Sequence, residues 1–312
     1  MDNFANYTKQ DFINLYEKPL SELMEISNKI TSENFDNEVE ACSIISAKTG
    51  ECGENCKYCS QSKHNHAKVE CHPLLDVETV KKAALSAKDN GATRFCIVTS
   101  GRVPSGEDFK KILEMIKEVA SIDGIHCCAS LGLLSEDQIA QIKAAGVERY
   151  NHNINTSENY HKNICTTHNF KDRVNTVKMI QKHGMEACCG VIIGMGESRE
   201  DRIDMALSLR ELNPKTVPIN FLNPIKGTAL EGFEDKITED EILKTICIFR
   251  IILPKALLRY AGGRTTRLSK FHQKLGLIAG INSVLVGNYL TTTGSTSEED
   301  KEMLKELDMV MV

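Results

Sequence analysis

Twelve cysteines stand in this chain of 312 residues, and three of them share one short segment. Cys52, Cys56 and Cys59 follow the spacing C-x3-C-x2-C. Three thiolates on one loop can bind three irons of a cubane iron–sulfur cluster and leave the fourth iron open to another ligand. The segment therefore predicts a metal centre with a vacant coordination position.

A structural zinc ion is the alternative for the same segment. Structural zinc normally takes four protein ligands, and the nearest further candidates are His64 and His66, five and seven residues beyond Cys59. Three cysteines already suffice for a cluster with one open iron, whereas zinc needs another ligand. We therefore favour the cluster.

The elements that must position this segment alternate regularly along the chain. Residues 1–35 have apolar side chains at helical spacing, and short β-rich segments then alternate with longer amphipathic ones. The predicted strands are residues 42–48, 94–100, 125–131, 147–153, 187–193, 216–222, 256–261 and 283–286. The predicted helices are residues 76–90, 107–121, 136–145, 170–183, 199–211, 239–252 and 268–279. Three of these helices stop at a glycine, a residue free to adopt positive φ: Gly91, Gly146 and Gly184.

Repeated strand–helix–strand units require a parallel sheet with right-handed crossovers. Eight strands favour a closed (β/α)8 barrel of the TIM type over an open doubly wound sheet. We expect an N-terminal helical extension over residues 1–35, one barrel domain over residues 36–312, and a C-terminal helix from Ser297. The cysteine segment then follows the first strand, at the carboxyl face where the active sites of such barrels lie.

The composition of the chain limits the classes of partner that it can be expected to bind. With 38 basic and 43 acidic residues, the net charge of −5 provides no overall positive field for nucleic acid or an anionic membrane. Tryptophan is absent, and no apolar run is long enough to predict a membrane span. The start of the chain has no secretion signal, and the cytosol keeps thiols reduced. We expect a cytoplasmic protein that acts on a small molecule.

Side-chain alternation turns one cysteine on each of three strands toward the barrel interior. In residues 94–100, Phe95 and Ile97 form the apolar set that faces the helices, so Cys96 points inward. The same argument directs three more residues inward: Cys128, Cys188 and Arg259. An arginine inside a barrel needs anionic partners, and a thiolate-bound iron–sulfur cluster would supply them.

The cysteine segment resembles the radical S-adenosylmethionine (SAM) superfamily, in which SAM binds the open iron of a 4Fe–4S cluster. Five phrases narrow the resemblance to the biotin synthase family: KYCSQ at 57–61, TRFC at 93–96, YNHN at 150–153, GMGE at 194–197 and VPIN at 217–220. The resemblance runs from about residue 40 to residue 305.

This resemblance implies an enzyme that converts dethiobiotin to biotin. It implies a 4Fe–4S cluster on Cys52, Cys56 and Cys59, with SAM as the source of a radical. It also implies an auxiliary 2Fe–2S cluster that donates sulfur, with these catalytic ligands: Cys96, Cys128, Cys188 and Arg259. A reduced flavodoxin or ferredoxin-type electron donor and a homodimer are further implications.

The resemblance also assigns polar residues at the upper face of the barrel. The implied cofactor-binding residues are Tyr58, Asn153, Asn155, Gly194, Gly196 and Glu197. The implied substrate-binding residues are Asn151, Asn153, Asn220, Thr292 and Thr293, with Thr291 beside them. Amides suit a neutral urea because they offer both donors and acceptors. The family usually has aspartate where Asn155 stands, so a charge that would strengthen contacts to the SAM ribose is missing.

The sequence does not decide which side chains of the first strand face the barrel interior. Cys42 shares its parity with Ile44 and Ser46. If this set points inward, a fourth thiolate becomes available, and the auxiliary cluster could have another ligand set or nuclearity.

Three further cysteines are interpreted as structural or incidental: Cys71, Cys165 and Cys247. Two alternatives for the function remain. One is another radical SAM enzyme with an auxiliary cluster, of the hydrogenase-maturase type. The other is a non-enzymatic iron–sulfur or zinc protein.

Overall fold

The computed structural model describes residues 4–287 and 295–312. Within them, a parallel sheet closes on itself because its last strand pairs back with its first. The barrel strands are β1 (Glu38–Lys48), β2 (Arg94–Thr99), β3 (His126–Ser130), β4 (Arg149–Asn151), β5 (Glu186–Cys188), β6 (Val191–Ile193), β7 (Thr216–Phe221), β8 (Leu257–Tyr260) and β9 (Ser283–Leu285). Since β5 and β6 share one position, the barrel has eight positions, and the predicted (β/α)8 barrel is confirmed.

The fifth barrel position differs from the single strand that the sequence predicts over residues 187–193. The structure interrupts this strand at Gly190. Pro218 of the adjacent β7 has no N–H to donate to this strand. The Gly190 nitrogen donates to a side chain, Asn153 Oδ1, at 2.9 Å. A Cβ on Gly190 would lie 1.9 Å from the Pro218 carbonyl oxygen, so the close approach of the two strands requires glycine.

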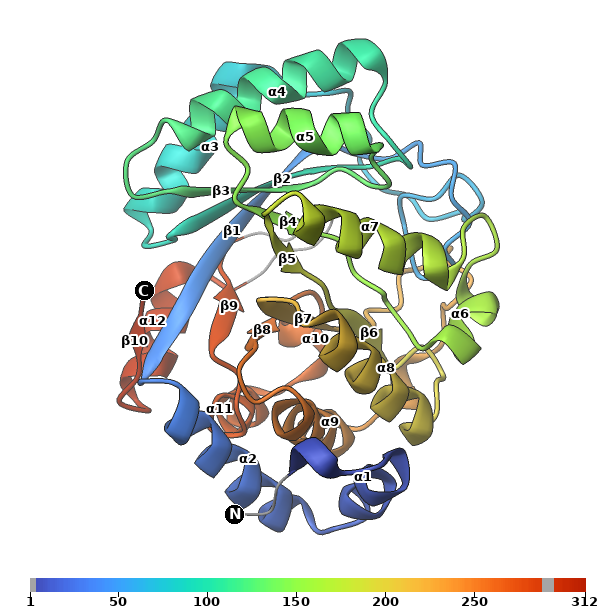
Figure 1. The fold of residues 1–312 in the computed structure, drawn as a ribbon, viewed down its shortest axis with the longest axis vertical. Helices are drawn as coiled ribbons and strands as arrows, with labels where there is room; N and C mark the ends of the chain where they lie inside the picture. Colours follow the sequence, from blue (N-terminus) through green and yellow to red (C-terminus); the bar gives the residue numbers. More distant parts are fainter. Residues whose placement is uncertain (1–3, 288–294) are drawn as a thin grey trace.

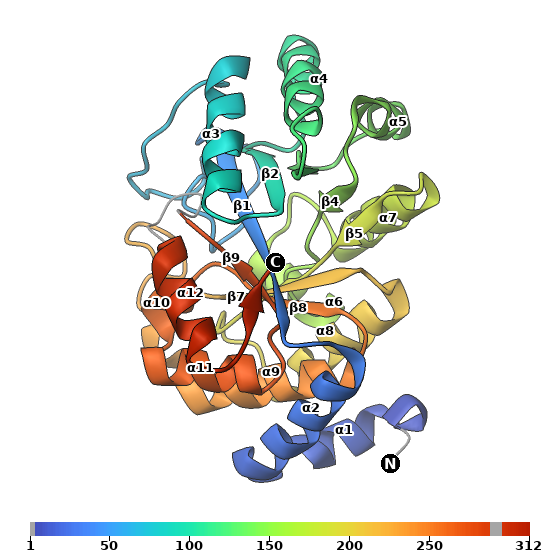
Figure 2. The same ribbon diagram turned by 90° about the vertical axis from the view of Figure 1, so that its left-hand side faces the viewer.

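Helices cover the outside of the barrel (Figures 1 and 2). Most begin at a polar side chain that accepts a backbone N–H, as Ser135 does from Gln138. The predicted glycine ends of three helices are confirmed by their positive φ: Gly91, Gly146 and Gly184. The helices are α1 (Lys9–Tyr16), α2 (Leu20–Asn34), α3 (Val77–Asp89), α4 (Gly106–Ala120), α5 (Glu136–Ala145), α6 (Glu158–Ile164), α7 (Phe170–Lys182), α8 (Arg199–Leu212), α9 (Glu239–Ile252), α10 (Arg264–Arg267), α11 (Lys270–Ile278) and α12 (Ser297–Lys305). The short α6 and α10 were not predicted.

The two ends of the chain pack onto the barrel. Figure 1 shows α1 and α2 beside α9 and α8, where the Tyr16 hydroxyl lies 2.7 Å from Thr245 Oγ1 and accepts a hydrogen bond from Arg202. At the other end, β10 (Val310–Met311) pairs in parallel with the start of β1. Among the described helices, none has the length and apolar composition needed to cross a membrane.

Apolar side chains form two separate layers around the strands. The large outer core fills the space between the sheet and the helices and includes Phe95 and Ile97. Inside the barrel, a small cluster comprises Cys42, Cys96, Cys128 and Leu285. The alternation of β2 thus divides its residues between the two layers as the sequence predicts.

Candidate active site

A cavity of about 280 Å³ lies inside the barrel. Its lining includes Cys96, Cys128, Cys188 and Arg259, which come from four different barrel positions and are each at most 5% exposed. Tyr58, from the loop that carries the other cysteine motif, lines the same cavity. The cavity therefore reaches from the barrel thiols to one residue of the cysteine loop.

Each cysteine doublet contributes one thiol to this cavity. Cys127 and Cys189 belong to the outer core with the helices, whereas Cys128 and Cys188 line the cavity. The alternation argument therefore holds on both strands.

Glu40 of β1 gathers three guanidinium groups beside the thiols. Its Oε1 lies 2.8 Å from Arg149 Nη1 and 2.7 Å from Arg259 Nη2, and its Oε2 lies 2.8 Å from Arg94 Nε. Glu186 Oε2 lies 2.8 Å from Arg149 Nε. Burial alone would raise the pKa of Glu40, but the charges of Arg259 and Arg149 outweigh it and lower this pKa to about 2. Sequence reasoning missed this network because charged residues at strand starts usually face solvent.

The network is suited to an anionic group. Three guanidinium groups face only two carboxylates. Arg149 Nη2 and Arg94 Nη1 are buried without a hydrogen-bond partner among the described residues. A thiolate-bound iron–sulfur cluster would supply negative charge and sulfur acceptors for such donors, so these residues fit the auxiliary cluster.

Burial controls the protonation of the cavity thiols. It raises the pKa of Cys96 and of Cys128, neighbouring cysteines add to the effect, and the charges of Arg149 and Arg94 oppose it at Cys128. Both are therefore neutral thiols at pH 7. Because metals bind thiolates, ligation at this site must release protons.

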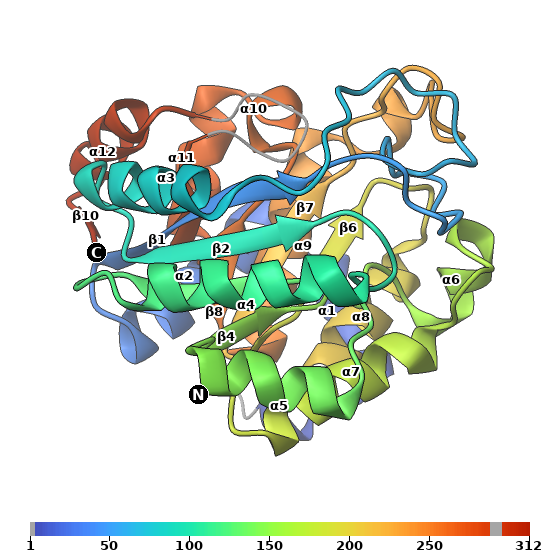
Figure 3. The same cartoon turned by 90° about the horizontal axis from the view of Figure 1, so that it is seen from above.

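The loop with Cys52, Cys56 and Cys59 lies beyond the carboxyl end of β1 (Figure 3). A side-chain amide organises it, since Asn65 Nδ2 donates to the Cys56 carbonyl at 3.1 Å and to the Cys59 carbonyl at 2.8 Å. The predicted position of the motif, at the carboxyl face of the barrel, is the observed one.

The loop thiols are spaced too widely for one ion. Zinc–sulfur bonds of about 2.3 Å would hold tetrahedral ligand sulfurs about 3.8 Å apart. In the described structure, the sulfurs of Cys52, Cys56 and Cys59 do not all lie within 4.8 Å of one another. The ring of His64 contacts the Gly53 carbonyl at 3.1 Å instead of approaching the three sulfurs as a group. This spacing fits a cluster better than zinc.

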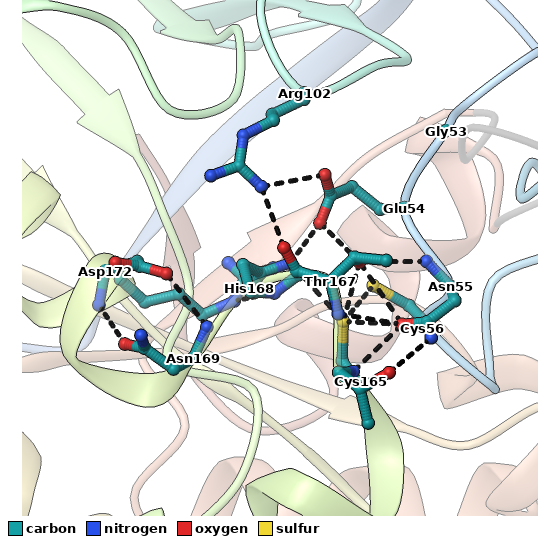
Figure 4. Close-up of polar contacts among 12 residues, drawn as sticks. Gly53, Glu54, Asn55, Cys56, Arg102, Cys165, Thr167, His168, Asn169 and Asp172 are labelled. Atoms are coloured by element: carbon teal, nitrogen blue, oxygen red, sulfur yellow. Dashed lines mark hydrogen bonds and ion pairs between the residues drawn. The ribbon is translucent and has the colours of Figure 1, made fainter.

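Cys165 lies against the loop, a contact that its position in the sequence did not reveal (Figure 4). Its Sγ is 3.7 Å from Cys56 Sγ and 3.4 Å from His168 Nδ1. Glu54 binds the same group, since its carboxylate contacts His168 and accepts from Arg102 Nη1 at 3.0 Å. Hydrogen bonds to ligand sulfurs influence the reduction potential of a cluster. Cys165 is therefore placed to affect a cluster bound through Cys56.

The asparagines predicted for substrate and SAM lie along the cavity, but most amide groups already have protein partners. Asn151 Nδ2 donates to Cys188 Sγ at 3.2 Å. Asn153 accepts from the Gly190 nitrogen, as described above. Asn220 Nδ2 donates to the Val191 carbonyl at 3.0 Å, and its Oδ1 accepts from the Gly262 nitrogen at 3.0 Å.

Two further groups of predicted residues have different outcomes. Asn155 has a positive φ of 67°, and its Nδ2 donates to the Tyr58 hydroxyl at 2.6 Å. This contact connects the end of β4 to the cysteine loop. The other group lies outside the described residues: Thr291, Thr292 and Thr293.

Glu197 organises the glycine-containing loop after β6. Its carboxylate accepts from the Gly194 nitrogen at 2.8 Å and the Met195 nitrogen at 2.7 Å. Arg202 Nε lies 2.9 Å from Glu197 Oε1, and both side chains are at most 5% exposed. Gly194 and Gly196 have positive φ, so glycine permits the turn that Glu197 holds.

Glu197→Ala is expected to lower the free energy of unfolding by about 3 to 5 kcal/mol, because it removes the buried carboxylate beside Arg202 Nε and leaves this guanidinium with only the Glu241 carboxylate among the described residues. Chemical denaturation followed by circular dichroism measures this change. Glu200→Ala, on the exposed side of the same region, is the control and should change stability little. Equal effects of the two substitutions would contradict the structural role of Glu197.

Comparisons with known proteins identify the family of this chain. The radical SAM superfamily pattern matches residues 47–209, and that of the biotin and thiamin synthesis associated domain matches residues 218–310. A biotin synthase from Acetivibrio thermocellus is 48% identical over 91% of this chain and 88% of its own length. A biotin synthase from Clostridium perfringens is 42% identical over 97% of this chain and 94% of its own length. The chain belongs to the biotin synthase family.

Solved structures extend the likeness to the fold of this biotin synthase family member. The crystal structure of methylornithine synthase matches with a TM-score of 0.84 at 21% identity, covering 99% of this chain and 96% of that one. A maturase of the [FeFe]-hydrogenase matches with a TM-score of 0.85 at 15% identity, covering 99% of this chain and 73% of that one. At such low identity these matches show the shared barrel only.

Proposed function

We propose that this member of the biotin synthase family converts dethiobiotin to biotin by inserting sulfur. The observation that carries the proposal is the single cavity that joins Tyr58 of the cysteine loop to thiols from three barrel strands. A ligand in that cavity would contact the barrel thiols and Tyr58, the neighbour of Cys59 in the sequence. An enzyme with a single cluster on the loop would not need three further thiols inside the barrel.

The chain's residues fit two clusters and SAM, the cofactors of a radical SAM biotin synthase. When bound, the 4Fe–4S cluster and SAM would supply a 5'-deoxyadenosyl radical for hydrogen abstraction, and the auxiliary cluster would supply sulfur. We assign the first cluster to Cys52, Cys56 and Cys59. We assign the auxiliary cluster to the part of the cavity that is lined by Cys96, Cys128, Cys188 and Arg259.

We assign the remaining site residues to the binding and orientation of SAM and the substrate. Tyr58 and Asn155, joined by a hydrogen bond, are assigned to SAM. The loop that Glu197 holds, with Gly194 and Gly196, is assigned to the adenine side. The barrel wall excludes water, which protects a reactive radical from side reactions. We assign the substrate to the amides that line the cavity: Asn151, Asn153 and Asn220.

The proposed chemistry also bears on the electron donor and the cellular compartment of the enzyme. Reduction of the loop cluster needs a one-electron donor, for which we propose a flavodoxin or ferredoxin-type protein. All twelve cysteines are free, which fits a reducing cytoplasm. We also propose a homodimer, and a barrel domain over residues 36–312 with a helical extension over residues 1–35.

Asn155→Asp is expected to tighten SAM binding by about fivefold, since a carboxylate forms stronger hydrogen bonds to hydroxyl groups than an amide does. The Tyr58 hydroxyl can donate to the new carboxylate, so the local contact survives. Equilibrium dialysis of the anaerobically reconstituted chain measures the dissociation constant. Asn213→Asp is the control, because Asn213 also has positive φ but caps the end of α8. An unchanged or weaker affinity for Asn155→Asp would contradict the assignment.

Anaerobic turnover with dithionite, SAM and dethiobiotin tests the reaction. Mass spectrometry should detect biotin together with 5'-deoxyadenosine. Formation of 5'-deoxyadenosine without biotin from the fully reconstituted protein would point to another radical SAM reaction. Absence of both products would favour a non-enzymatic iron–sulfur protein.

A further inference from the structure

Cys42 of β1 is a fourth thiol in the barrel cavity. It is 1% exposed and packs in one cluster with Cys96 and Cys128. It lines the same cavity as Cys188. The first strand therefore has the inward phase for Cys42 that the sequence left open, and four barrel positions each present one thiol to one space.

The electrostatic environment also places Cys42 among these groups. Burial raises the pKa of the Cys42 thiol, the charge of Arg259 opposes this increase, and Glu40 and Cys188 add to it. Cys42 is in turn among the groups that act on Cys96 and Cys128. Each of the other cavity thiols is thus an electrostatic neighbour of Cys42.

Arg259, in contrast, already has partners for two of its nitrogen atoms. Its Nη2 lies 2.7 Å from Glu40 Oε1, and its Nε donates to Ser283 Oγ at 2.8 Å. Its Nη1 lies 3.9 Å from Cys188 Sγ. A guanidinium carries donors only and stays protonated in proteins. Ion pairing with a buried carboxylate strengthens that preference, so Arg259 is better placed to donate a hydrogen bond than to ligate iron.

We propose that four thiolates, from Cys42, Cys96, Cys128 and Cys188, hold the auxiliary cluster of this protein, and that Arg259 is a charged hydrogen-bond partner rather than a ligand. The inference rests on the proposed function, which requires an auxiliary cluster in this cavity. Each ligation replaces an S–H bond with an S–Fe bond and releases the proton to solvent. No electron transfer is required for this step.

The surrounding cations suit four thiolates. Arg149 lines the cavity, and its buried Nη2 atom has no hydrogen-bond partner among the described residues. Arg149 Nη2, together with Arg259 Nη1 beside Cys188 Sγ, offers donors to cluster sulfurs. Ligation by four cysteine thiolates is a common arrangement for both 2Fe–2S and 4Fe–4S clusters, so the donor set does not depend on nuclearity.

Mössbauer spectroscopy of the full chain, reconstituted anaerobically with ⁵⁷Fe, tests the ligand set. The wild type should show two cluster subspectra. In Cys42→Ala, the auxiliary subspectrum should be lost or altered, and bound iron and sulfide should fall, while the loop-cluster subspectrum remains. Arg259→Lys, which keeps the cation beside Glu40, should retain the wild-type auxiliary subspectrum. Cys127→Ala is the matched control, because Cys127 is a buried cysteine of the outer core.

The outcomes separate the two proposals. An unaltered auxiliary subspectrum in Cys42→Ala, or its loss in Arg259→Lys with retention in Cys42→Ala, would overturn the four-thiolate assignment and leave the proposed function standing. A wild type with only the loop cluster would overturn the proposed function itself. If Cys42→Ala does not fold, Cys42→Ser preserves the side-chain size. Its oxygen ligand would shift the auxiliary subspectrum only if residue 42 binds iron.

Discussion

Cys188→Ala is expected to reduce biotin formation by more than about 100-fold while 5'-deoxyadenosine still forms. Even residues that only support a metal ligand change affinity or activity by about 10- to 100-fold, and Cys188 is assigned as a ligand itself. SAM cleavage depends on the loop thiols and therefore continues. Mass spectrometry of both products in the same anaerobic reaction gives the comparison directly.

The neighbouring cysteine provides the control for this experiment. Cys189 is as buried as Cys188 but belongs to the outer core. Cys189→Ala removes the same atoms from the adjacent residue and should leave both products close to wild-type amounts. If Cys188→Ala formed biotin as the wild type does, Cys188 would not be required for the sulfur-donating site.

Cys59→Ala is expected to abolish SAM cleavage, and with it the formation of biotin, because the loop cluster loses one of its three thiolates. The expected loss again exceeds about 100-fold, but it now affects 5'-deoxyadenosine as well. Cys188→Ala and Cys59→Ala thus separate sulfur insertion from SAM cleavage. Product analysis after reconstitution, with an iron count, records both effects.

Cys71→Ala is the control for the loop variant, since Cys71 is an exposed cysteine close to Gly50 at the base of the loop. It should retain the wild-type iron content and both products. Continued 5'-deoxyadenosine formation by Cys59→Ala would show that another residue binds the cluster. Cys165, 3.7 Å from Cys56, would then be the first to examine.

The barrel and the inward cysteines could be predicted because their determinants are local. Alternation along β2 separates Phe95 and Ile97 from Cys96 without any knowledge of neighbouring strands. Likewise, the cysteine doublets orient one thiol in each direction. Eight strands separated by helices then leave few ways to close a parallel sheet.

The features that escaped prediction depend on partners far away in the sequence. The interruption at Gly190 arises from Pro218 on the next strand, and no residue pattern within 187–193 reveals it. Cys165 reaches Cys56 only through the fold. The role of Glu40 is visible only once Arg149 and Arg259 surround it.

The central claim is that a cluster in the barrel cavity donates the sulfur atom of the product. Reconstitution of the auxiliary site with ³⁴S-sulfide, followed by one anaerobic turnover with SAM and dethiobiotin, tests it most directly. The account predicts that mass spectrometry will find the heavy isotope in biotin. Biotin that contains only sulfur of natural abundance, formed by protein whose cavity cluster is fully labelled, would contradict it.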